Sequence, residues 1–316
     1  MEVLICDIKI GNLNFDFVHS LSVESSWKNL TQKATIVIPA ALKVDSNKLK
    51  DAIPKGSEVT IKVGYESTGL TEIFSGFVSR VHPKVPIEIE CEDLMWKLKQ
   101  IQITENAKNE TIQSYLEKVL PYDVDCFDVA LPKFVVNKLT GAQLLDQLKK
   151  DYGFPIFVRN GKIVVGKQYD PENQSTHRFI IEGGGNTNVK DHSLEYTSKD
   201  DIKLKVTAIS NLSNGDKIEV TIGDSDGEER TLNFFDLQKA DLENIATKEM
   251  ERLRYDGFRG DFKAFGAPLV FHGDKCELSN PQESDKTGTY WIDAVNYDFG
   301  VDGFEQTIKL GPIASL

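Results

Sequence analysis

The sequence has few of the residues that build metal sites and disulfide frameworks. Only 4 of its 316 residues are cysteine, and no Cys-x-x-Cys pair occurs. Zinc sites and disulfide scaffolds depend on such spacing, so neither is expected. Most of the thiols are predicted to be small buried groups in the core. The four positions are Cys6, Cys91, Cys126 and Cys276.

Positive charge is also scarce. Lys and Arg number 37 against 49 Asp and Glu, which gives a net charge of -12. Such a chain repels phosphate and gains little from counterion release, so sequence-specific binding of nucleic acid is not expected. No apolar run approaches the ~20 residues that span a bilayer, and the N-terminus has no basic signal segment. We expect a soluble protein made in the cytoplasm, with no membrane insertion of this chain.

The few histidines form no catalytic or metal-binding pattern. None has a Ser, a Cys or a second His at the spacing of a triad or a metal pair, and His272-Gly-Asp274 is interpreted as a turn. We therefore expect no catalytic residue, no cofactor, no metal ligand and no enzyme. A carboxylate pair for glycoside hydrolysis stays open, because such a pair is recognised by its separation in space. The histidines are His19, His82, His177, His192 and His272.

Three further motifs have structural interpretations. Gly183-Gly184-Gly185 lacks the strand and helix context of a phosphate loop, so we interpret it as a turn between domains. The acidic run Asp224–Glu229 lacks the spacing of a calcium loop and is interpreted as a hairpin tip. Trp27, Trp96 and Trp291 could stack on sugars, but each lies in or beside a strand pattern, where an aromatic ring usually packs into the core.

Alternation of apolar and polar residues dominates residues 3–91, as at Ala34, Ile36 and Ile38. This period is typical of antiparallel strands with one face in water. About six such runs, separated by Gly-Asn, Pro and Lys-Gly turns, fit a closed or sandwiched β domain better than a flat sheet with exposed edges. We place the end of this first β domain near Lys97.

The pattern changes to helical spacing after Lys97. One helix is predicted over 112–120 and a second over 140–152, where Thr140 and Gln143 form a capping box. Gly153 is the expected stop of the second helix. Asn160-Gly161 then joins two β-branched runs, which predicts a hairpin with a type I′ turn. This segment is interpreted as a small α+β insert.

Strand alternation returns at 202–208 and 218–222, across an Asn214-Gly215 turn. A third helix is predicted over 242–253, with Gly257 placed to end it. Further strands are predicted at 274–278, 289–297 and 303–310.

The first and last β regions repeat each other at a fixed offset. Adding 217 to the number of a small or apolar residue in the first region gives a similar residue in the last one, without a gap. Two alternating stretches can also be slid into register by chance, and this alternative stays open. A duplicated β domain is the sharper hypothesis, and a trimer of such chains would have near-sixfold symmetry. The pairs are Gly56 and Gly273, Val59 and Cys276, Ile61 and Leu278, Phe74 and Trp291, Val78 and Val295, Ile87 and Phe304, and Cys91 and Ile308.

Three strings converge on one family. The first is 74–100 (FSGFVSRVHPKVPIEIECEDLMWKLKQ), which resembles the close of the first barrel in baseplate hub proteins of phage tails and contractile injection systems. The second is 139–169 (LTGAQLLDQLKKDYGFPIFVRNGKIVVGKQY), which is similar to their small α+β domain. The third is 255–278 (YDGFRGDFKAFGAPLVFHGDKCEL) with 288–312 (GTYWIDAVNYDFGVDGFEQTIKLGP), which is similar to the end of their second barrel.

The resemblance implies a late-control-D-like hub, similar also to the base of type VI secretion spike proteins. The implied fold is mainly β with an α+β insert, and it contains two tube-type antiparallel β-barrels plus a small α+β domain. The expected domains are a first tube-like barrel (1–97), the α+β insert and linker (98–190) and a second tube-like barrel (191–316). A homotrimer would form a pseudo-hexameric ring between the hexameric tail tube and the trimeric central spike.

The resemblance also implies a set of partners and a location. The partners are the tail tube protein, the central spike protein, and the tape-measure and other baseplate proteins, in the virion tail baseplate assembled in the bacterial cytoplasm. Secretion-type spike proteins continue into an OB-fold and a β-helical needle, so with this chain ending at Leu316 we expect the needle to be a separate protein. Two alternatives stay open: a tail-tip peptidoglycan-degrading enzyme with an acidic pair from the insert or from Asp224–Glu229, and a glycan-binding β module.

Overall fold

A computed structural model describes most of the chain. The described residues are 2–39, 52–82, 85–127, 130–169, 175–182, 185, 187–212, 216–283 and 286–314. Two predicted turns lie outside them, namely Asn214-Gly215 and the first two glycines of the run at 183–185. Among the described residues, every helix is too short or too polar to cross a bilayer.

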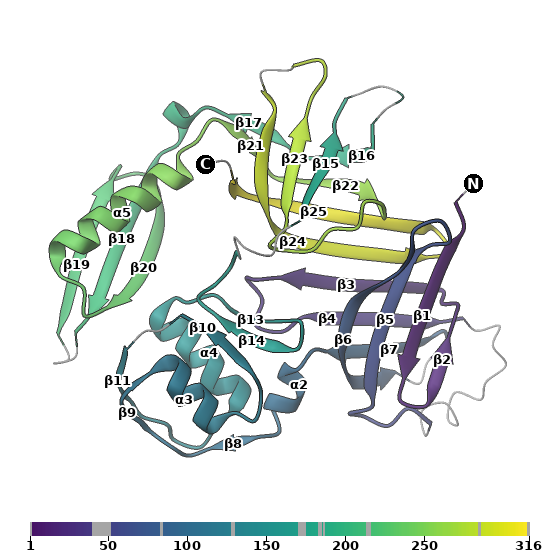
Figure 1. Cartoon of the computed structure of the whole chain (residues 1–316), viewed down its shortest axis with the longest axis horizontal. Helices are drawn as coiled ribbons and strands as arrows, with labels where there is room; N and C mark the ends of the chain where they lie inside the picture. The colour runs from purple at the N-terminus through teal and green to yellow at the C-terminus, as the bar shows by residue number, and fades with distance from the viewer. Residues whose placement is uncertain are drawn as a thin grey trace.

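A 13-stranded sheet occupies the centre of the molecule (Figure 1). Strands take up 51% of the residues and helices 16%, which confirms the predicted mainly β class. The first region contributes β1 (Leu4–Ile10), β2 (Leu13–Phe15), β3 (Ser20–Ser26), β4 (Lys33–Ile38), β5 (Glu58–Tyr65), β6 (Gly69–His82) and β7 (Ile87–Glu92). The later regions contribute β15 (Thr176–Ile180), β16 (Val189–His192), β22 (Asp261–Phe265), β23 (Lys275–Ser279), β24 (Gly288–Gly300) and β25 (Gly303–Ile313).

The two β regions are joined in this one sheet. Its order is β16-β22-β25-β24-β3-β4-β7-β6-β5-β1-β2, and β23 pairs with both β24 and β15. The junction is an antiparallel ladder between β3 and β24, which runs from Ser26 opposite Ala294 to Ser20 opposite Gly300. Sequence alternation predicts which side chains face the core, but it does not say which strand edges meet.

The strand order repeats within the sheet. The first region has the order β1-β5-β6-β7-β4-β3, and the second has β15-β23-β24-β25-β22-β16. Neighbouring strands are antiparallel in both regions, with one exception. β1 runs antiparallel to β5, whereas the corresponding strand β15 runs parallel to β23. This topology supports the duplication and counts against a chance register.

The repeat extends to single residues. Gly56 donates its N–H to the carbonyl of Val78 (2.8 Å), and Gly273 donates to Ile292 in the same way (2.8 Å). Both glycines have the left-handed backbone that favours glycine, with φ of 89° and 91°, and a β-bulge follows both Val78 and Ile292. The offset is therefore 217 at the glycines but 214 in the long strand. Val78 corresponds to Ile292, and across the next ladder Ile89 corresponds to Ile308. The predicted matches of Phe74, Val78, Ile87 and Cys91 are therefore wrong by two or three residues.

One hydrophobic core runs under both regions of the sheet. Val23, Ile36 and Ile89 from the first region lie in the same cluster as Val295 and Ile308 from the second, and all five are 0% exposed. The intervening residues on each strand face water, as the alternation predicts. Burial of this apolar surface is the main stabilising contribution to such a sheet.

The four cysteine side chains are buried, which confirms the prediction that they are core groups. Burial raises the pKa of Cys6 to about 11 and that of Cys91 to about 12, and it also raises the pKa of Cys276. Thiols in this state are poor nucleophiles.

The insert has its own core around α3 (Ile112–Val119) and α4 (Gly141–Tyr152). The predicted capping box of α4 is present, because Thr140 Oγ1 accepts the Gln143 N–H (3.2 Å) and Gln143 Oε1 accepts the Thr140 N–H (2.8 Å). Gly153 ends this helix in the left-handed conformation, as expected. The other elements are α2 (Met95–Leu98), β8 (Gln102–Ile103), β9 (Ala107–Thr111), β10 (Val124–Cys126), β11 (Ala130–Phe134) and β12 (Leu139–Thr140).

The predicted hairpin of the insert is confirmed. β13 (Ile156–Arg159) pairs antiparallel with β14 (Lys162–Val165). Asn160 and Gly161 between them both have positive φ, 51° and 73°, as a type I′ turn requires.

A third core lies between α5 (Lys239–Leu253) and a separate sheet of three strands in the order β19-β18-β20. These elements lie where the periodicity predicts strands and a helix, but within the described residues their sheet does not pair with the large one. α5 ends at Leu253 with Arg254 as its cap, so the predicted role of Gly257 as the helix stop is wrong. The strands of this sheet are β18 (Leu204–Asn211), β19 (Lys217–Gly223) and β20 (Glu228–Phe235).

The glycine-rich segment after α5 returns the chain to the large sheet. Gly257 opens β21 (Gly257–Arg259), which pairs with β17 (Glu195–Thr197). Gly260, with φ of 114°, leads from β21 into β22. A short 3-10 helix, η2 (Lys199–Asp201), follows β17. The segment thus forms strands.

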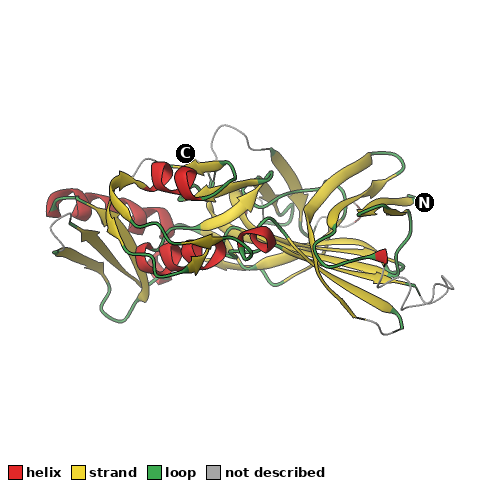
Figure 2. Cartoon of the chain, turned by 90° about the horizontal axis from the view of Figure 1, so that it is seen from below, coloured by secondary structure: helices red, strands yellow, loops and turns green. Residues whose placement is uncertain are grey.

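The helices gather away from the N-terminus (Figure 2). α3, α4 and α5 lie toward one end of the molecule, whereas the end that carries the N-terminus is built from strands of the large sheet (Figure 1). The molecule therefore has one end built of strands and one mixed end.

Candidate functional site

The face of the large sheet turned away from the core is polar and acidic. Strand alternation places Glu24 between the buried Val23 and Ser25, and it exposes Asp298 in the same way. The six neighbouring strands from β22 to β7 carry seven carboxylates but only three lysines on this face. The charged residues are Asp261, Lys263, Glu305, Lys309, Asp298, Glu24, Lys33, Glu88, Glu90 and Glu92. We call this surface the acidic face.

Each lysine of the acidic face lies opposite a carboxylate on a neighbouring strand. Lys33 lies between Glu24 and Glu92, and Lys309 lies opposite Asp261. Lys263 lies opposite Asp191 of β16. Such cross-strand pairs contribute ~0.2–1 kcal/mol each. The positive charges are therefore balanced locally. Two of the carboxylates, Glu305 and Glu92, also form ion pairs with Lys190 and Lys99 beside the face.

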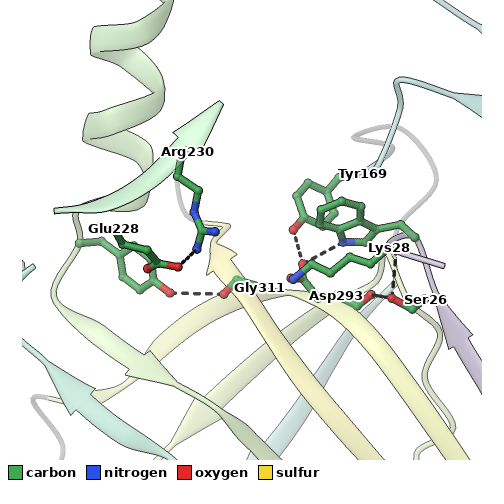
Figure 3. Close-up of polar contacts among 9 residues, drawn as sticks. Ser26, Lys28, Tyr169, Glu228, Arg230, Asp293 and Gly311 are labelled. Atoms are coloured by element: carbon green, nitrogen blue, oxygen red, sulfur yellow. Dashed lines mark hydrogen bonds and ion pairs between the residues drawn. The ribbon is translucent and has the colours of Figure 1, made fainter. Parts of the chain in front are cut away.

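Asp293 connects both halves of the sheet with the insert (Figure 3). Trp27, just after β3, donates its indole N–H to Asp293 Oδ1 (3.0 Å), and Lys28 Nζ lies 2.8 Å from Oδ2. Tyr169, which follows the insert hairpin, donates its hydroxyl to Oδ1. Burial, followed by the neighbouring carboxylate, raises the pKa of Tyr169, so this hydroxyl stays a donor. The Asp293 side chain is only 7% exposed and sits in the β24 bulge, so the cluster is a structural joint.

The three tryptophans are half-buried, and each has an aromatic partner. Trp27 meets Tyr169 edge-on at a centroid distance of 6.3 Å, and Trp291 stacks on the same ring at 4.6 Å. Trp96 stacks on Phe77 at 5.7 Å. Because each of these rings is half-buried and packs against another protein ring, the geometry favours packing over a sugar platform.

The structure brings together Ser25 and His272, which are 247 positions apart in the sequence. Ser25 Oγ lies 2.6 Å from His272 Nδ1. Burial, followed by the charge of Arg159, lowers the pKa of His272 to about 3, and Ser25 is 4% exposed. A catalytic base needs a pKa near the working pH and access to substrate. The pair is therefore a packing contact, and Phe157 of the insert lies against the histidine ring (5.3 Å).

The other histidines have different surroundings. His82 Nε2 lies 2.8 Å from Glu90 Oε1 and 3.9 Å from Glu88 Oε1. One histidine and two carboxylates can coordinate a metal, but all three side chains are partly exposed and equally fit an ion-paired sheet edge. His177 Nε2 lies 3.3 Å from Asp274 Oδ2. We assign no metal site to these groups.

The acidic run Asp224–Glu229 is a crossover and not the predicted hairpin tip. It leads from β19 to β20, which lie on opposite sides of β18. Asp224 accepts the N–H of Leu204 at the start of β18 (3.1 Å) and forms an ion pair with Arg254. These contacts hold the loop at the start of β18, which is a structural role.

An open cavity of about 360 Å³ lies where the β3–β24 ladder ends. His19, Asp298, Asp302 and Glu305 contribute to its lining, together with the ring of Phe299. The cavity continues the acidic face, and its charge has the same sign.

Solved structures of low sequence similarity share this fold over nearly the whole chain. A tail protein from Neisseria meningitidis MC58 matches with a TM-score of 0.67 and 15% identity, over 98% of this chain and 96% of its own. A 43 kDa tail protein of prophage MuSo2 from Shewanella oneidensis matches with a TM-score of 0.64 and 14% identity, over 97% of both chains. An E. coli component of the type VI secretion system, itself similar in structure to bacteriophage T4 tail proteins, matches with a TM-score of 0.59 and 10% identity, over 96% of this chain and 76% of its own.

No protein-family model and no curated protein matches the sequence. The likeness therefore rests on structure, and it shows that this chain has the fold of phage tail proteins and of type VI secretion spike-related proteins.

Proposed function

We propose that this chain is the structural baseplate hub of a phage tail or phage-like injection particle. In this role it forms a homotrimer that joins the hexameric tail tube to the trimeric central spike. Its place is the tail baseplate of the virion, assembled in the bacterial cytoplasm. Its neighbours are the tube and spike proteins, with the tape-measure and other baseplate proteins around them.

The observation that carries this proposal is the repeated strand order of the large sheet. Two copies of one unit in a chain give six similar units in a trimer, and six units can match a sixfold partner. The proposed units are residues 1–97 and 191–316, with the insert and linker at 98–190 between them. β15 and the start of β16 precede residue 191, so the strand repeat would extend the second unit back into the linker. The small sheet of β18 to β20 with α5 is then an excursion within the last unit.

The proposed mechanism is symmetry adaptation. Each chain presents one end of each of its two similar barrel units to the six tube subunits. The insert and the α5 unit occur once per chain, so in a trimer they present a threefold surface to the spike. The gathering of the helices at one end of the molecule fits this division (Figure 2).

The acidic face is proposed to line the channel of the ring. Phosphate contacts with Lys and Arg supply most of the non-specific affinity for nucleic acid, and the carboxylates outnumber the lysines on this face. DNA passing such a wall is repelled and not held.

The chain is proposed to act without catalysis. The Asp293 joint, the buried Ser25–His272 pair and the Asp224 crossover are interpreted as structural contacts. A zymogram with the purified chain is expected to show no clearing of peptidoglycan.

Electron microscopy of the purified chain tests the proposed function. We expect class averages of a threefold ring with an open channel. When the ring is mixed with the tail tube protein of the same particle, one trimer is expected to bind for every six tube subunits. Compact single-chain particles that do not bind the tube protein would contradict the hub.

A further inference from the structure

The junction inside the chain predicts how two copies of the chain meet. β24 has β25 along one edge, and along the other edge it has first β23 and then β3. β6 corresponds to β24, with β7 on one edge and β5 on the other. On the side of β6 that pairs with β5, the last backbone hydrogen bonds join Val78 to Gly56 and Ser57. Beyond Val78, no strand of the described residues pairs with this side of β6. The uncovered residues of this edge are Arg80, Val81 and His82.

A second uncovered edge corresponds to β3. β3 pairs with β4 on one side and with β24 on the other. Its counterparts in the second region are β16 and β17, which pair with β22 and β21 on one side. Within the part of the chain that the structure describes, no strand pairs with their other side.

We propose that β17 of one copy pairs antiparallel with the end of β6 in the next copy, in the register that β3 and β24 use within the chain. The proposal rests on the proposed trimer and names the surfaces that would close it. In this register Arg80 lies opposite Thr197, Val81 opposite Tyr196, and His82 opposite Glu195.

The register follows from equivalent pairs on both sides. Val81 lies opposite Ile89 after the bulge of β6, as Val295 lies opposite Ile308 after the bulge of β24. Val81 therefore corresponds to Val295.

The other side of the register comes from β3. In the first region Leu21 lies opposite Ile36, which in turn lies opposite Ile89. In the second region His192 lies opposite Phe262, which in turn lies opposite Ile308. Leu21 and His192 are therefore equivalent positions. Tyr196 follows His192 by four residues and Ser25 follows Leu21 by four residues, so Tyr196 is the counterpart of Ser25. In the internal junction Ser25 lies opposite Val295.

Burial supports the same pairing. At the internal junction Ser25 is 4% exposed and Val295 is 0% exposed. Their counterparts are more open: Tyr196 is 40% exposed, and Val81 is only partly buried. Val85, just beyond β6, is 69% exposed. Apolar side chains left open at both edges are typical of surfaces that a partner covers.

Charge supports a partner of this kind. The β6 edge carries Arg80, and Glu195 would lie diagonal to it, whereas His82 already contacts Glu90 of its own copy. Opposite charges at these cross-strand positions attract. The pairing is head-to-tail, because the two edges are different, and such contacts close into rings when the rotation allows it. Closure would also remove two open strand edges, which are otherwise sites of aggregation.

A cross-linking experiment on the full chain tests the register. In V81C/Y196C the two thiols would lie on directly opposite residues of neighbouring copies, within reach of a disulfide. The matched control is V81C/E195C, in which the second thiol points to the other face of the sheet. The four native cysteines are buried, so the unmodified chain and both single variants give the background.

After mild oxidation we expect V81C/Y196C to give covalent dimers and trimers on a non-reducing gel, while the control stays at the level of the single variants. Light scattering on the same samples separates the possible failures. A trimeric mass without cross-links in V81C/Y196C would overturn this interface and leave the hub proposal standing. A monomeric mass without cross-links would overturn both.

A second variant tests the interface without cysteine chemistry. Y196D would place a charge at the centre of the pairing and is expected to raise the concentration needed for half-assembly by at least about tenfold. V301D, at an exposed apolar residue of the β24–β25 turn, is the control and is expected to assemble like the unmodified chain. Equal assembly of Y196D and V301D would contradict the interface.

Discussion

Val78 and Ile292 are equivalent residues of two long strands, and each accepts a hydrogen bond from a turn glycine. The backbone carbonyl of each accepts the N–H of a glycine with positive φ, and each residue precedes a β-bulge in the longest strand of its region. A shared backbone detail of this kind is harder to reach by chance than shared alternation, because it needs the same glycine, strand edge and bulge together. The large sheet therefore behaves as two copies of one unit, and the proposed ring follows from that repeat.

The Asp293 joint is expected to stabilise the chain strongly. Asp293→Ala leaves the Trp27 indole N–H and the Tyr169 hydroxyl without their acceptor, and it leaves Lys28 without its ion-pair partner. We expect the free energy of unfolding to fall by ~3–5 kcal/mol, measured by urea denaturation. Asp298→Ala, on the same strand but exposed, is the control and should change it by ~0.5 kcal/mol or less. Equal effects of the two substitutions would mean that Asp293 is not a joint.

The repeated glycine turn can be tested at Gly56. A Cβ at this position would lie 2.5 Å from Trp96 Cη2, and the backbone φ is 89°. Gly69 has a similar φ of 82° with nothing within 4 Å of the added Cβ, so Gly69→Ala measures backbone strain alone. We expect Gly69→Ala to lower the free energy of unfolding by ~1–2 kcal/mol and Gly56→Ala to lower it by ~1–3 kcal/mol more. A difference near zero would show that the ring of Trp96 moves aside freely.

Asp93 gives the stability a specific pH dependence. Its carboxylate accepts the N–H groups of Gln32 and Met95 (2.8 and 2.9 Å), yet burial raises its pKa to about 7. Because the folded pKa exceeds the unfolded one, the stabilisation from the protonated form is complete below about pH 4 and is lost as the pH rises through 7.

We therefore expect the Asp93→Asn variant to gain stability relative to the unmodified chain as the pH rises from 4 to 8, measured by thermal unfolding. The change in their free-energy difference is expected to be on the order of 1–4 kcal/mol. A difference that stays constant over this range would mean that Asp93 does not titrate there.

The acidic face predicts weak contact with DNA. The unmodified chain is expected to cause no gel shift of duplex DNA even at low salt, because its carboxylates outnumber its lysines there. Glu24→Lys with Asp298→Lys reverses two charges on this face and is expected to produce a shift that salt abolishes. A shift with the unmodified chain would contradict the proposed channel wall.

Local features of the fold were predictable because they depend on neighbours in sequence. The capping box of α4 and the Asn160-Gly161 turn each follow from residues within a few positions. Alternation likewise located the buried faces of β4, β5 and β7. The mainly β class follows from these elements taken together.

Contacts between distant segments could not be predicted in the same way. Three contacts join residues that are more than 240 positions apart in the sequence, and no local pattern predicts them. They are the β3–β24 ladder, the contact of Trp27 with Asp293 and the contact of Ser25 with His272. The offset of 217 did indicate a repeat, but it missed a three-residue change in the long strand, because gap-free matching cannot represent a shifted bulge. Gly257 was misassigned for a related reason, since a glycine after a helix can also open a strand.

The solution mass of the purified chain tests the central claim most directly. We would measure it by light scattering behind size exclusion at two concentrations. The proposed hub predicts a mass near three times 35.4 kDa, with the trimer favoured at the higher concentration. A mass of 35.4 kDa at both concentrations would contradict a ring formed by this chain alone.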